Sequence, residues 1–421
     1  MRRGRHFTRR DRAPSVERVA IVAQDVNRAA GHGSPWPVVL RGGAALAMSM
    51  GIGRFVYTPI LPLMVDEAGL SRSSGATLAT ANYGGYLLGA LLGVLVPALV
   101  RSTAVLRMSV VALIASLALM PISTAVPVWF VLRFAAGAAS ALVFVIAVSA
   151  MLVQLRGHAQ QLVGWAFGGI GVGIALSGLL VLLVQSTSTW RAAWWASAAL
   201  AAALTVAAWT LRPEPAGAAT AMQQHGDTQR TRRWFAALFT AYSLEGVGYI
   251  IAGTFLVAAI GENSPGWIGS GAWVLVGLCA IPASAGWAML ARRRSRPTLL
   301  AVALFVQAVG IALPGLVGGV VPALVSAALF GATFLSVASL ALAVGAHLQT
   351  QHAVAILTTG YSVGQLLGPL IAQPMLHNGY HVALLVGALI VLAAAAAAAT
   401  LRARFPHRVG TMVEPSRAGT P

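Results

Sequence analysis

Long apolar runs recur along almost the whole chain and are separated by short polar segments. Most contain about 20 residues, which is enough for a helix to cross a hydrocarbon core about 30 Å thick. The pattern therefore predicts an all-α integral membrane protein with twelve transmembrane helices, six on each side of one longer polar segment. We expect these helices at residues 37–64, 76–99, 104–124, 128–152, 162–184, 192–211, 234–260, 271–291, 299–317, 321–344, 353–376 and 382–401.

The longer polar segment is rich in proline, glycine and glutamine and ends in several arginines. This composition is typical of a linker between two folded units. The arginine-rich start of the chain is not followed closely by an apolar stretch, so a signal peptide is not expected. The predicted organisation is a disordered basic cytoplasmic tail at residues 1–36, an N-terminal six-helix bundle at 37–211, a cytoplasmic linker at 212–233, a C-terminal six-helix bundle at 234–401 and a cytoplasmic tail at 402–421.

Composition supports a membrane location. Of the 421 residues, 58% are hydrophobic and 9% are charged, whereas soluble globular domains carry about 25% charged residues. This excludes an ordinary soluble enzyme, a disordered chain and a nucleic-acid-binding domain, although the formal net charge is +18. The chain has no lysine, and its richness in alanine and arginine is typical of a bacterium with a GC-rich genome.

The positions of the arginines indicate which helix ends face the cytoplasm. If both termini are cytoplasmic, all of the 28 arginines except four lie on that side. Arg54 and Arg133 fall within predicted helices, while Arg72 and Arg191 lie on the opposite side. Cytoplasmic loops of membrane proteins carry such an excess of positive residues. We therefore expect a multi-pass protein of the bacterial inner membrane with both termini in the cytoplasm.

The two sets of six helices share glycine patterns in the same order, which indicates a duplicated unit. Each match has a second explanation, because small residues also let membrane helices pack closely. A six-helix unit duplicated in parallel would place a substrate near the middle of the membrane, between two bundles. The matching patterns are Gly51-Ile-Gly53 with Gly246-Val-Gly248, Gly137 with Gly331, and Gly164 and Gly168 with Gly360 and Gly364.

The twelve helices, the duplicated halves and the segment Arg133-Phe-Ala-Ala-Gly137 at the start of the fourth helix together resemble the pattern of the major facilitator superfamily. Gly-Ile-Gly-Arg-Phe-Val-Tyr-Thr-Pro-Ile-Leu-Pro from residue 51 resembles its YbfB/YjiJ-type branch, as do the segments at 245–256 and 364–369. The resemblance covers residues 38–401 and implies transport by alternating access, with Arg133 in proton coupling. The loop between the second and third helices departs from the family pattern, because residues 93–107 contain no acid.

Three ionisable residues, Arg54, Arg133 and Glu245, fall within predicted helices and away from their cytoplasmic ends. A charge at the membrane centre costs about 2.5–3.5 kcal/mol on insertion scales, so each is expected to face a cavity or a partner. Burial favours the neutral form of a carboxyl group, as a reversible proton carrier requires. We therefore predict proton coupling at Glu245, together with Arg133, whose part in coupling is what the resemblance implies. The alternatives are arginines that extend to the membrane surface, and a static ion pair from Glu245 that joins the two halves.

Polar and aromatic side chains near these charges could line the same cavity. Each aromatic residue could instead serve packing or sit at the membrane interface. Two positive groups against one negative group favour an anionic substrate, such as an organic acid, over a lipophilic cation. The predicted substrate-binding residues are Arg54, Tyr57, Tyr249, Tyr361 and Gln365, and further candidates are Asn82, Tyr83, Trp165 and Tyr242.

The sequence thus predicts a secondary active transporter of a small molecule, coupled to protons, with an organic anion as the favoured substrate class. The alternatives are efflux of drugs or metabolites by proton antiport, and a transport-inactive membrane sensor or scaffold. A self-contained ATP-driven pump is excluded, because its phosphate-binding loop needs a lysine that the chain lacks.

An enzyme is not expected, because no nucleophile, base or metal cluster lies within the helices. The nine histidines fall outside them and no H-E-x-x-H pattern occurs, so neither a metal nor another cofactor is predicted. The single cysteine, Cys279, is interpreted as a small buried hydrophobic residue. The expected partners are the substrate, protons and the lipid bilayer, without nucleic acid, and the chain is expected to be a monomer.

Overall fold

Every regular element that the computed structural model describes is a helix, as predicted. The described residues are 34–155, 158, 161–186, 189–213, 228–262, 264, 266–348, 350, 353–403 and 405. The first half contains α2 (Trp36–Leu46), η1 (Ala47–Ile52), α3 (Tyr57–Ala68), α4 (Arg72–Leu95), α5 (Pro97–Val100), α6 (Thr103–Leu119), η2 (Met120–Ile122), α7 (Val126–Gln154), α8 (Gln161–Val184) and α9 (Trp190–Ala208). The second half contains α10 (Thr228–Glu262), α11 (Gly266–Leu290), α12 (Arg296–Leu316), α13 (Val320–Gly331), α14 (Phe334–His347), α15 (Ala353–Ala372), η3 (Gln373–Asn378) and α16 (His381–Thr400).

Within the described residues, 12 helical segments are long and apolar enough to cross a membrane, which confirms the predicted number. Most ends lie within a few residues of the prediction. The second span begins at Arg72 rather than at 76, because the Ser71 side chain caps it by accepting a hydrogen bond from the Ser74 N–H at 3.0 Å. The predicted tails and linker lie mostly outside the described residues, so the predicted domain boundaries remain predictions.

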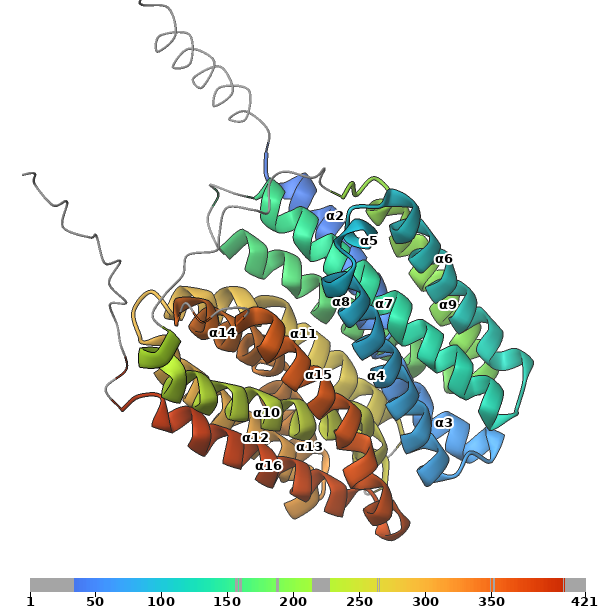
Figure 1. Ribbon diagram of the computed structural model, residues 1–421. Helices are drawn as coiled ribbons and strands as arrows, with labels where there is room; N and C mark the ends of the chain where they lie inside the picture. Colours follow the sequence, from blue (N-terminus) through green and yellow to red (C-terminus); the bar gives the residue numbers. More distant parts are fainter. Residues whose placement is uncertain are drawn as a thin grey trace, which may run out of the picture. The chain divides into compact units, whose positions relative to one another are not determined.

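The two halves pack side by side within one compact unit that begins at Val38. Figure 1 shows the helices of the first half in blue to green and those of the second half in yellow to red. The most extensive contacts between the halves are those of α8 with α11, α4 with α15, and α3 with α10. Any site between the halves is therefore bounded by these pairs.

Equivalent glycines produce the same close approach in both halves. A Cβ atom on Gly137 of α7 would collide with the carbonyl oxygen of Asn82 on α4. A Cβ atom on Gly331 of α13 would collide in the same way with the carbonyl oxygen of Val276 on α11. The second and fourth spans of each half thus touch through backbone at the same level, as expected of a duplicated unit.

The first span is not a continuous α-helix. Its backbone widens through the π-helix η1, and the Gly53 and Phe55 N–H groups donate to carbonyls five residues earlier at 2.9 and 3.1 Å. A turn at residues 53–56 then separates η1 from α3. Such widened turns free backbone groups and are frequent at functional sites. Arg54 lies in this turn.

The tenth span is also broken, at Ala332 and Thr333 between α13 and α14. The Trp287 indole N–H from α11 donates to the Ala332 carbonyl at 2.9 Å, so the freed backbone group has a partner inside the protein. Lipid cannot supply such a partner, which explains why a polar ring nitrogen is placed there.

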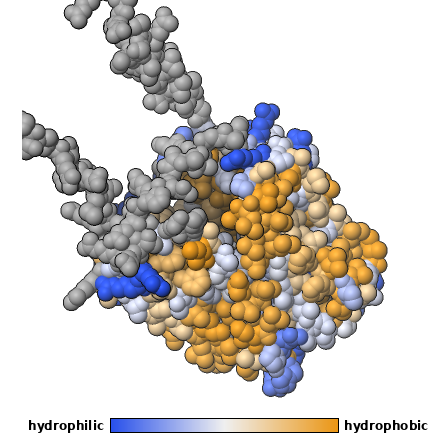
Figure 2. All heavy atoms as spheres, in the orientation of Figure 1, coloured by the Kyte–Doolittle hydropathy of each residue, from blue (hydrophilic) through white to orange (hydrophobic). Residues whose placement is uncertain are grey.

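The outer surface suits a lipid environment. Figure 2 shows broad hydrophobic areas over the helices. Large apolar side chains are exposed there, such as Leu95 at 74%, Met108 at 70% and Val206 at 76%. In water such a surface would aggregate, whereas in a bilayer it contacts acyl chains.

Candidate functional site

Arg54 is buried in a box of aromatic rings at the break in the first span. Its side chain lies 4.3 Å from the centre of the Tyr86 ring, 4.9 Å from that of Tyr83 and 5.3 Å from that of Phe55. Its exposed fraction is 2%. The electron-rich faces of aromatic rings stabilise a cation where water is excluded. The rings therefore hold the guanidinium inside the protein.

The Arg54 guanidinium also connects the two halves. Its Nη2 donates a hydrogen bond to the Gln365 side-chain oxygen on α15, while its Nε is buried without a partner. Both described ion pairs of the protein involve other residues, so the described polar side chains bonded to Arg54, the Gln365 amide and the Tyr86 hydroxyl, are both neutral. A buried cation without a counter-charge is costly. Arg54 is thus suited to bind an anion.

Two more hydrogen bonds join the halves beside Arg54. Tyr83 and Thr254 share a bond of 2.8 Å between their hydroxyl oxygens, and the Thr58 hydroxyl donates to the Gly253 carbonyl. Since the Thr254 hydroxyl donates to the Ile250 carbonyl at 2.7 Å, the Tyr83 hydroxyl is the donor to Thr254. The first span and α4 are therefore linked to the middle of α10.

Arg133 supports the broken backbone of the first span. Its Nη2 donates to the Arg54 carbonyl at 3.2 Å and its Nη1 to the Gly53 carbonyl at 3.4 Å. The Arg54 carbonyl is free because the Thr58 N–H donates to Phe55 instead. The structure therefore brings Arg133 close to Arg54 through the backbone, and its role in proton coupling remains a prediction.

Tyr57 stacks near Arg133 rather than near the Arg54 guanidinium. The Arg133 side chain lies 4.8 Å from the centre of the Tyr57 ring. The Tyr57 hydroxyl donates to the Gly75 carbonyl on α4 at 2.9 Å. Asn82 of α4 donates to the Arg133 carbonyl at 2.9 Å. These contacts connect the first residue of α3 to α4 and α7, and so fix the turn that holds Arg54.

Glu245 is fully buried in the middle of α10. Its Oε1 accepts a hydrogen bond from the Gln307 amide on α12 at 3.3 Å. The other oxygen of each side chain, Glu245 Oε2 and Gln307 Oε1, is buried without a partner. Among the described residues Glu245 forms no ion pair. Its side chain bonds to the Gln307 amide in the second half, and it does not pair with an arginine of the first half.

Tyrosine rings stack beside this region in the second half. Tyr361 of α15 lies between Tyr242 and Tyr249 of α10, with ring centres 4.3 and 5.4 Å apart and planes within 9°. Phe334 extends the stack from Tyr249 at 6.3 Å. The structure thus brings Tyr249 and Tyr361 together, while Trp165 on α8 is 41% exposed and makes no described contact with these residues.

An apolar groove of about 560 Å³ runs between α10 and α15. It is lined by residues that include Phe239, Val247, Thr359 and Leu367. These positions lie before residue 248 of α10 and before residue 368 of α15, far from the end of α10 at Glu262. The groove contains neither Arg54 nor Glu245, so it is not the charged site.

Two contributors were not singled out from the sequence. Gln307 is a polar residue within a predicted apolar helix, a signal that could have identified it. Tyr86, one turn after Asn82 on α4, could have been found from its spacing to Tyr83. The bond between Arg54 and Gln365, in contrast, depends on how two spans far apart in the chain meet.

Comparison with known proteins agrees with this architecture. The family model described as "Uncharacterised MFS-type transporter YbfB" matches residues 46–399. A crystal structure of a mutant of the nucleoside transporter NupG is similar at 15% identity, covering 87% of this chain and 99% of that chain with a TM-score of 0.67. A second NupG crystal structure matches at 14% identity, covering 87% and 98%, with a TM-score of 0.64. The curated proteins include no match. At these identities, the likeness to NupG shows the fold.

Proposed function

The chain belongs to the family of MFS-type transporters represented by YbfB, and on this premise we propose that it carries a small organic anion together with a proton by alternating access. The family makes it a secondary transporter of small molecules in a membrane. The proposal adds the substrate class, the coupling ion and the residues that bind each. It also places the protein in a bacterial inner membrane, with cytoplasmic termini, as a monomer.

One observation carries the proposal: Arg54 is a buried cation whose described polar side-chain partners, the Gln365 amide and the Tyr86 hydroxyl, are both neutral. A carboxylate that replaced the amide oxygen would neutralise the guanidinium and could use its unpartnered Nε. Arginine is suited to bind carboxylates because its donors match the two oxygens. Because Gln365 belongs to the other half, such a ligand would contact both halves.

Glu245 and Gln307 support the binding of a proton. A proton on Glu245 Oε2 would turn that oxygen into a donor, and Gln307 Oε1 is an acceptor that lacks one. An acid and an amide can then form two hydrogen bonds to each other, which would satisfy both unpartnered atoms. The carboxylate form leaves both atoms unsatisfied, at a cost of about 1–3 kcal/mol for each buried polar group.

The two sites suggest how proton and anion are coupled. With an anion on Arg54 and a proton on Glu245, these two residues and their ligands together carry no net charge, as they do when both ligands are absent, while the Arg133 charge is present in every state. With only one ligand bound, the same groups carry a net charge of one, and a buried charge costs about 2.5–3.5 kcal/mol on insertion scales. Movement of the halves against each other is therefore favoured when both ligands are bound or both are absent. This is the behaviour of a proton–anion symporter.

The contacts at the interface fit such a movement. The bonds of Arg54 to Gln365 and of Tyr83 to Thr254 must break when the two halves separate at the level of Arg54. Arg133 holds the turn that carries Arg54, so a change in Gln365 or the ligand can reach it through the backbone. We assign Arg133 to coupling in this indirect, positioning sense.

Purified protein in liposomes that contain a pH-sensitive dye tests the proposal. A panel of organic acids, neutral sugars and lipophilic cations is added in turn, with protein-free liposomes as the blank. We expect the acids alone to trigger proton entry, and Glu245→Gln to abolish it. Glu67→Gln is the matched control, because Glu67 accepts a hydrogen bond from the Trp190 N–H within the first half. Proton movement driven by cations would contradict the proposal and favour drug–proton antiport.

A further inference from the structure

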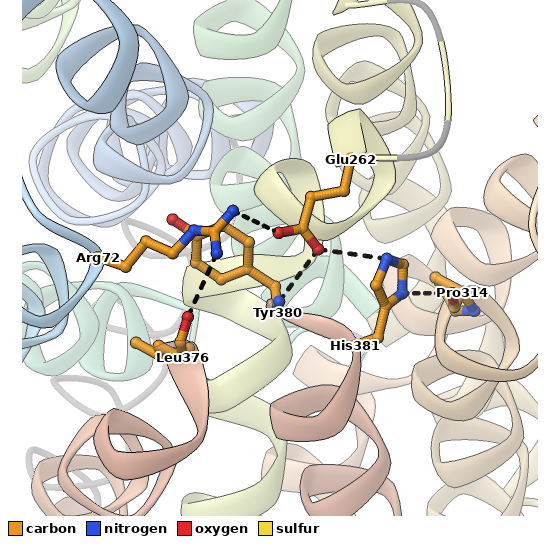
Figure 3. A network of polar contacts seen from close by, with 6 residues as sticks. All are labelled: Arg72, Glu262, Pro314, Leu376, Tyr380 and His381. Carbon is orange, nitrogen blue, oxygen red and sulfur yellow. Dashed lines mark hydrogen bonds and ion pairs between the residues drawn. The ribbon is translucent and has the colours of Figure 1, made fainter. Parts of the chain in front are cut away.

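A network of charges joins the two halves where α10 ends and α4 begins. Arg72 is the first residue of α4 and Glu262 the last of α10, and their side chains form an ion pair of 2.9 Å between Nη2 and Oε1. The Arg72 side chain is 39% exposed and that of Glu262 20%. Figure 3 shows the Glu262 carboxylate at the centre of this network, with Arg72 on one side and His381 on the other.

His381, the first residue of α16, contacts the same carboxylate. Its Nε2 lies 3.2 Å from Glu262 Oε2, and its Nδ1 lies 2.9 Å from the Pro314 carbonyl oxygen of α12. The Tyr380 N–H donates to Glu262 Oε2 at 3.1 Å. The imidazole is therefore placed between two oxygen atoms from two different helices, as Figure 3 shows.

The hydrogen-bond roles of these atoms require an extra proton. A carbonyl oxygen can only accept, so Nδ1 must carry a hydrogen to bond Pro314. An ionised carboxylate also only accepts, so Nε2 must carry a second hydrogen to bond Glu262. If Nε2 carries none, the carboxyl group must carry it instead. In both cases the pair holds one proton more than a neutral imidazole and a carboxylate.

Among the contacts described at this end, no other group supplies this proton. Arg72 of α4 is a permanent cation, and burial raises the pKa of Tyr380 to about 12, so its phenol is neutral. Asp66 of α3 acts electrostatically on Tyr380, and His377 of η3 is exposed. Pro314 contributes only a carbonyl from α12. The exchangeable proton therefore belongs to the pair of His381 and Glu262.

We propose that His381 and Glu262 form a proton-binding site whose proton keeps this end of the transporter closed. Without the proton, in the tautomer that keeps the Nδ1 hydrogen bond to Pro314, the Nε2 lone pair faces the carboxylate, and repulsion displaces Glu262 from Tyr380 and Arg72. The ion pair with Arg72 is one of several contacts between the halves at this end. The other contacts include bonds from Arg72 to the Leu376 carbonyl at 3.4 Å, from Gln373 to Ser73 at 2.7 Å and from Ser270 to Gln185 at 2.9 Å.

The direction of the pH effect follows from proton counting. Closure takes up a proton, so the closed form is favoured at low pH and is lost as pH rises. The inference rests on the proposed function, because a transporter must open this end of the protein. It adds a second proton, bound by His381 and Glu262, that controls opening and is separate from the proton on Glu245.

The test measures the distance between the halves by electron paramagnetic resonance on the full-length protein. Spin labels are attached at Thr124→Cys and Asn378→Cys, two exposed positions at this end, with Cys279→Ala to remove the native thiol. The ratio of closed to open protein is expected to fall as pH rises, by at most about tenfold per pH unit for one proton. A ratio that does not change with pH overturns the proposal.

Two substitutions at the histidine sharpen the test. His381→Gln carries an amide that does not titrate, so the closed fraction should not change with pH. His381→Lys keeps a cation that can donate to both oxygens, so the closed fraction should stay high at every pH. Glu67→Gln, the control acid, should keep the wild-type pH profile. A wild-type profile in His381→Gln or in His381→Lys overturns the proposal.

The readout separates this inference from the proposed function. It uses no substrate and no pH gradient across a membrane. If organic acids fail to move protons in liposomes while the distance still changes with pH through His381, the proposed substrate is wrong and the gate stands. If acids move protons but the distance ignores pH, the gate is wrong and the proposed function stands.

Discussion

At the level of single residues, the three charges buried in the helices have different surroundings. Arg133 donates to two backbone carbonyls, and Glu245 accepts from one amide. Arg54 donates to one amide and lies among aromatic rings. Arg133 therefore has partners that a ligand cannot replace, whereas Arg54 and Glu245 each have capacity left for an anion and a proton. This difference underlies the division of roles that we propose.

The substitution Gln365→Glu tests whether Arg54 binds the anion. The new carboxylate would pair with the guanidinium inside the protein and compete with the substrate. Hydrogen bonds to charged groups contribute about 1.5–3 kcal/mol, so uptake of organic acids should fall by about 10- to 100-fold. Initial uptake rates in liposomes measure this. Gln365→Asn keeps a neutral amide and should lose less; equal losses in the two variants would contradict the role of the charge.

The substitution Arg133→Met tests the support of the broken span. It leaves the Gly53 and Arg54 carbonyls buried without a donor, at a cost of about 1–3 kcal/mol each. We expect a clear drop in the midpoint of thermal unfolding in detergent. Arg191→Met is the control, because Arg191 is exposed and surface changes usually stay within about 0.5 kcal/mol. Equal stability of the two variants would show that Arg133 does not support the turn.

At the level of elements, the sequence predicted the twelve spans well because each needs about 20 apolar residues, and the composition leaves few alternatives. It did not predict the break in the first span, although Gly51 and Gly53 were recognised as a repeated pattern. The break depends on Arg133 arriving from the fourth span, which is a contact between distant segments. Arg54 could be predicted as a buried charge from its position near the middle of the first span. Its bond to Gln365 could not be predicted, because it depends on how α15 packs against the first half.

The close approach at Gly137 can be tested by adding a single methyl group. Gly137→Ala would push a Cβ into the Asn82 carbonyl, and overpacking of this kind costs about 1–3 kcal/mol. Gly286→Ala is the matched control, because a Cβ there meets nothing within 4 Å and alanine favours a helix. Thermal unfolding should show a loss for the first variant and none for the second. No loss in Gly137→Ala would contradict the close packing of α7 on α4.

At the level of the whole molecule, the described ion pair between the halves lies at one end, whereas at the opposite end a longer bond joins Arg292 to the Gln161 side chain at 3.4 Å. The Arg72–Glu262 pair and the Gln373–Ser73 bond lie at the ends of α4, α10 and α15. The apolar groove between α10 and α15 lies in the parts of these helices that are distant from that end. This arrangement fits a transporter closed at the Arg72 end. A site bounded by both halves is alternately exposed when these bonds break and others form.

The proposed orientation predicts which loops an impermeant thiol reagent reaches. In a protein with Cys279→Ala, a cysteine at the exposed position Thr124 should react on intact cells. A cysteine at the exposed position Arg293 should react only after the membrane is opened, because arginine-rich loops stay in the cytoplasm. Labelling followed by gel shift measures both. The reverse pattern would invert the topology and the side from which the gate takes its proton.

The central claim is that a proton on Glu245 travels with an anion bound at Arg54. The most direct measurement compares two modes of transport of a radiolabelled organic acid in liposomes: accumulation driven by an imposed pH gradient, and exchange against unlabelled acid without a gradient. Wild-type protein should perform both. Glu245→Gln should keep the exchange and lose the accumulation, because the amide mimics the protonated acid and cannot release a proton. Accumulation that persists in Glu245→Gln would contradict the account.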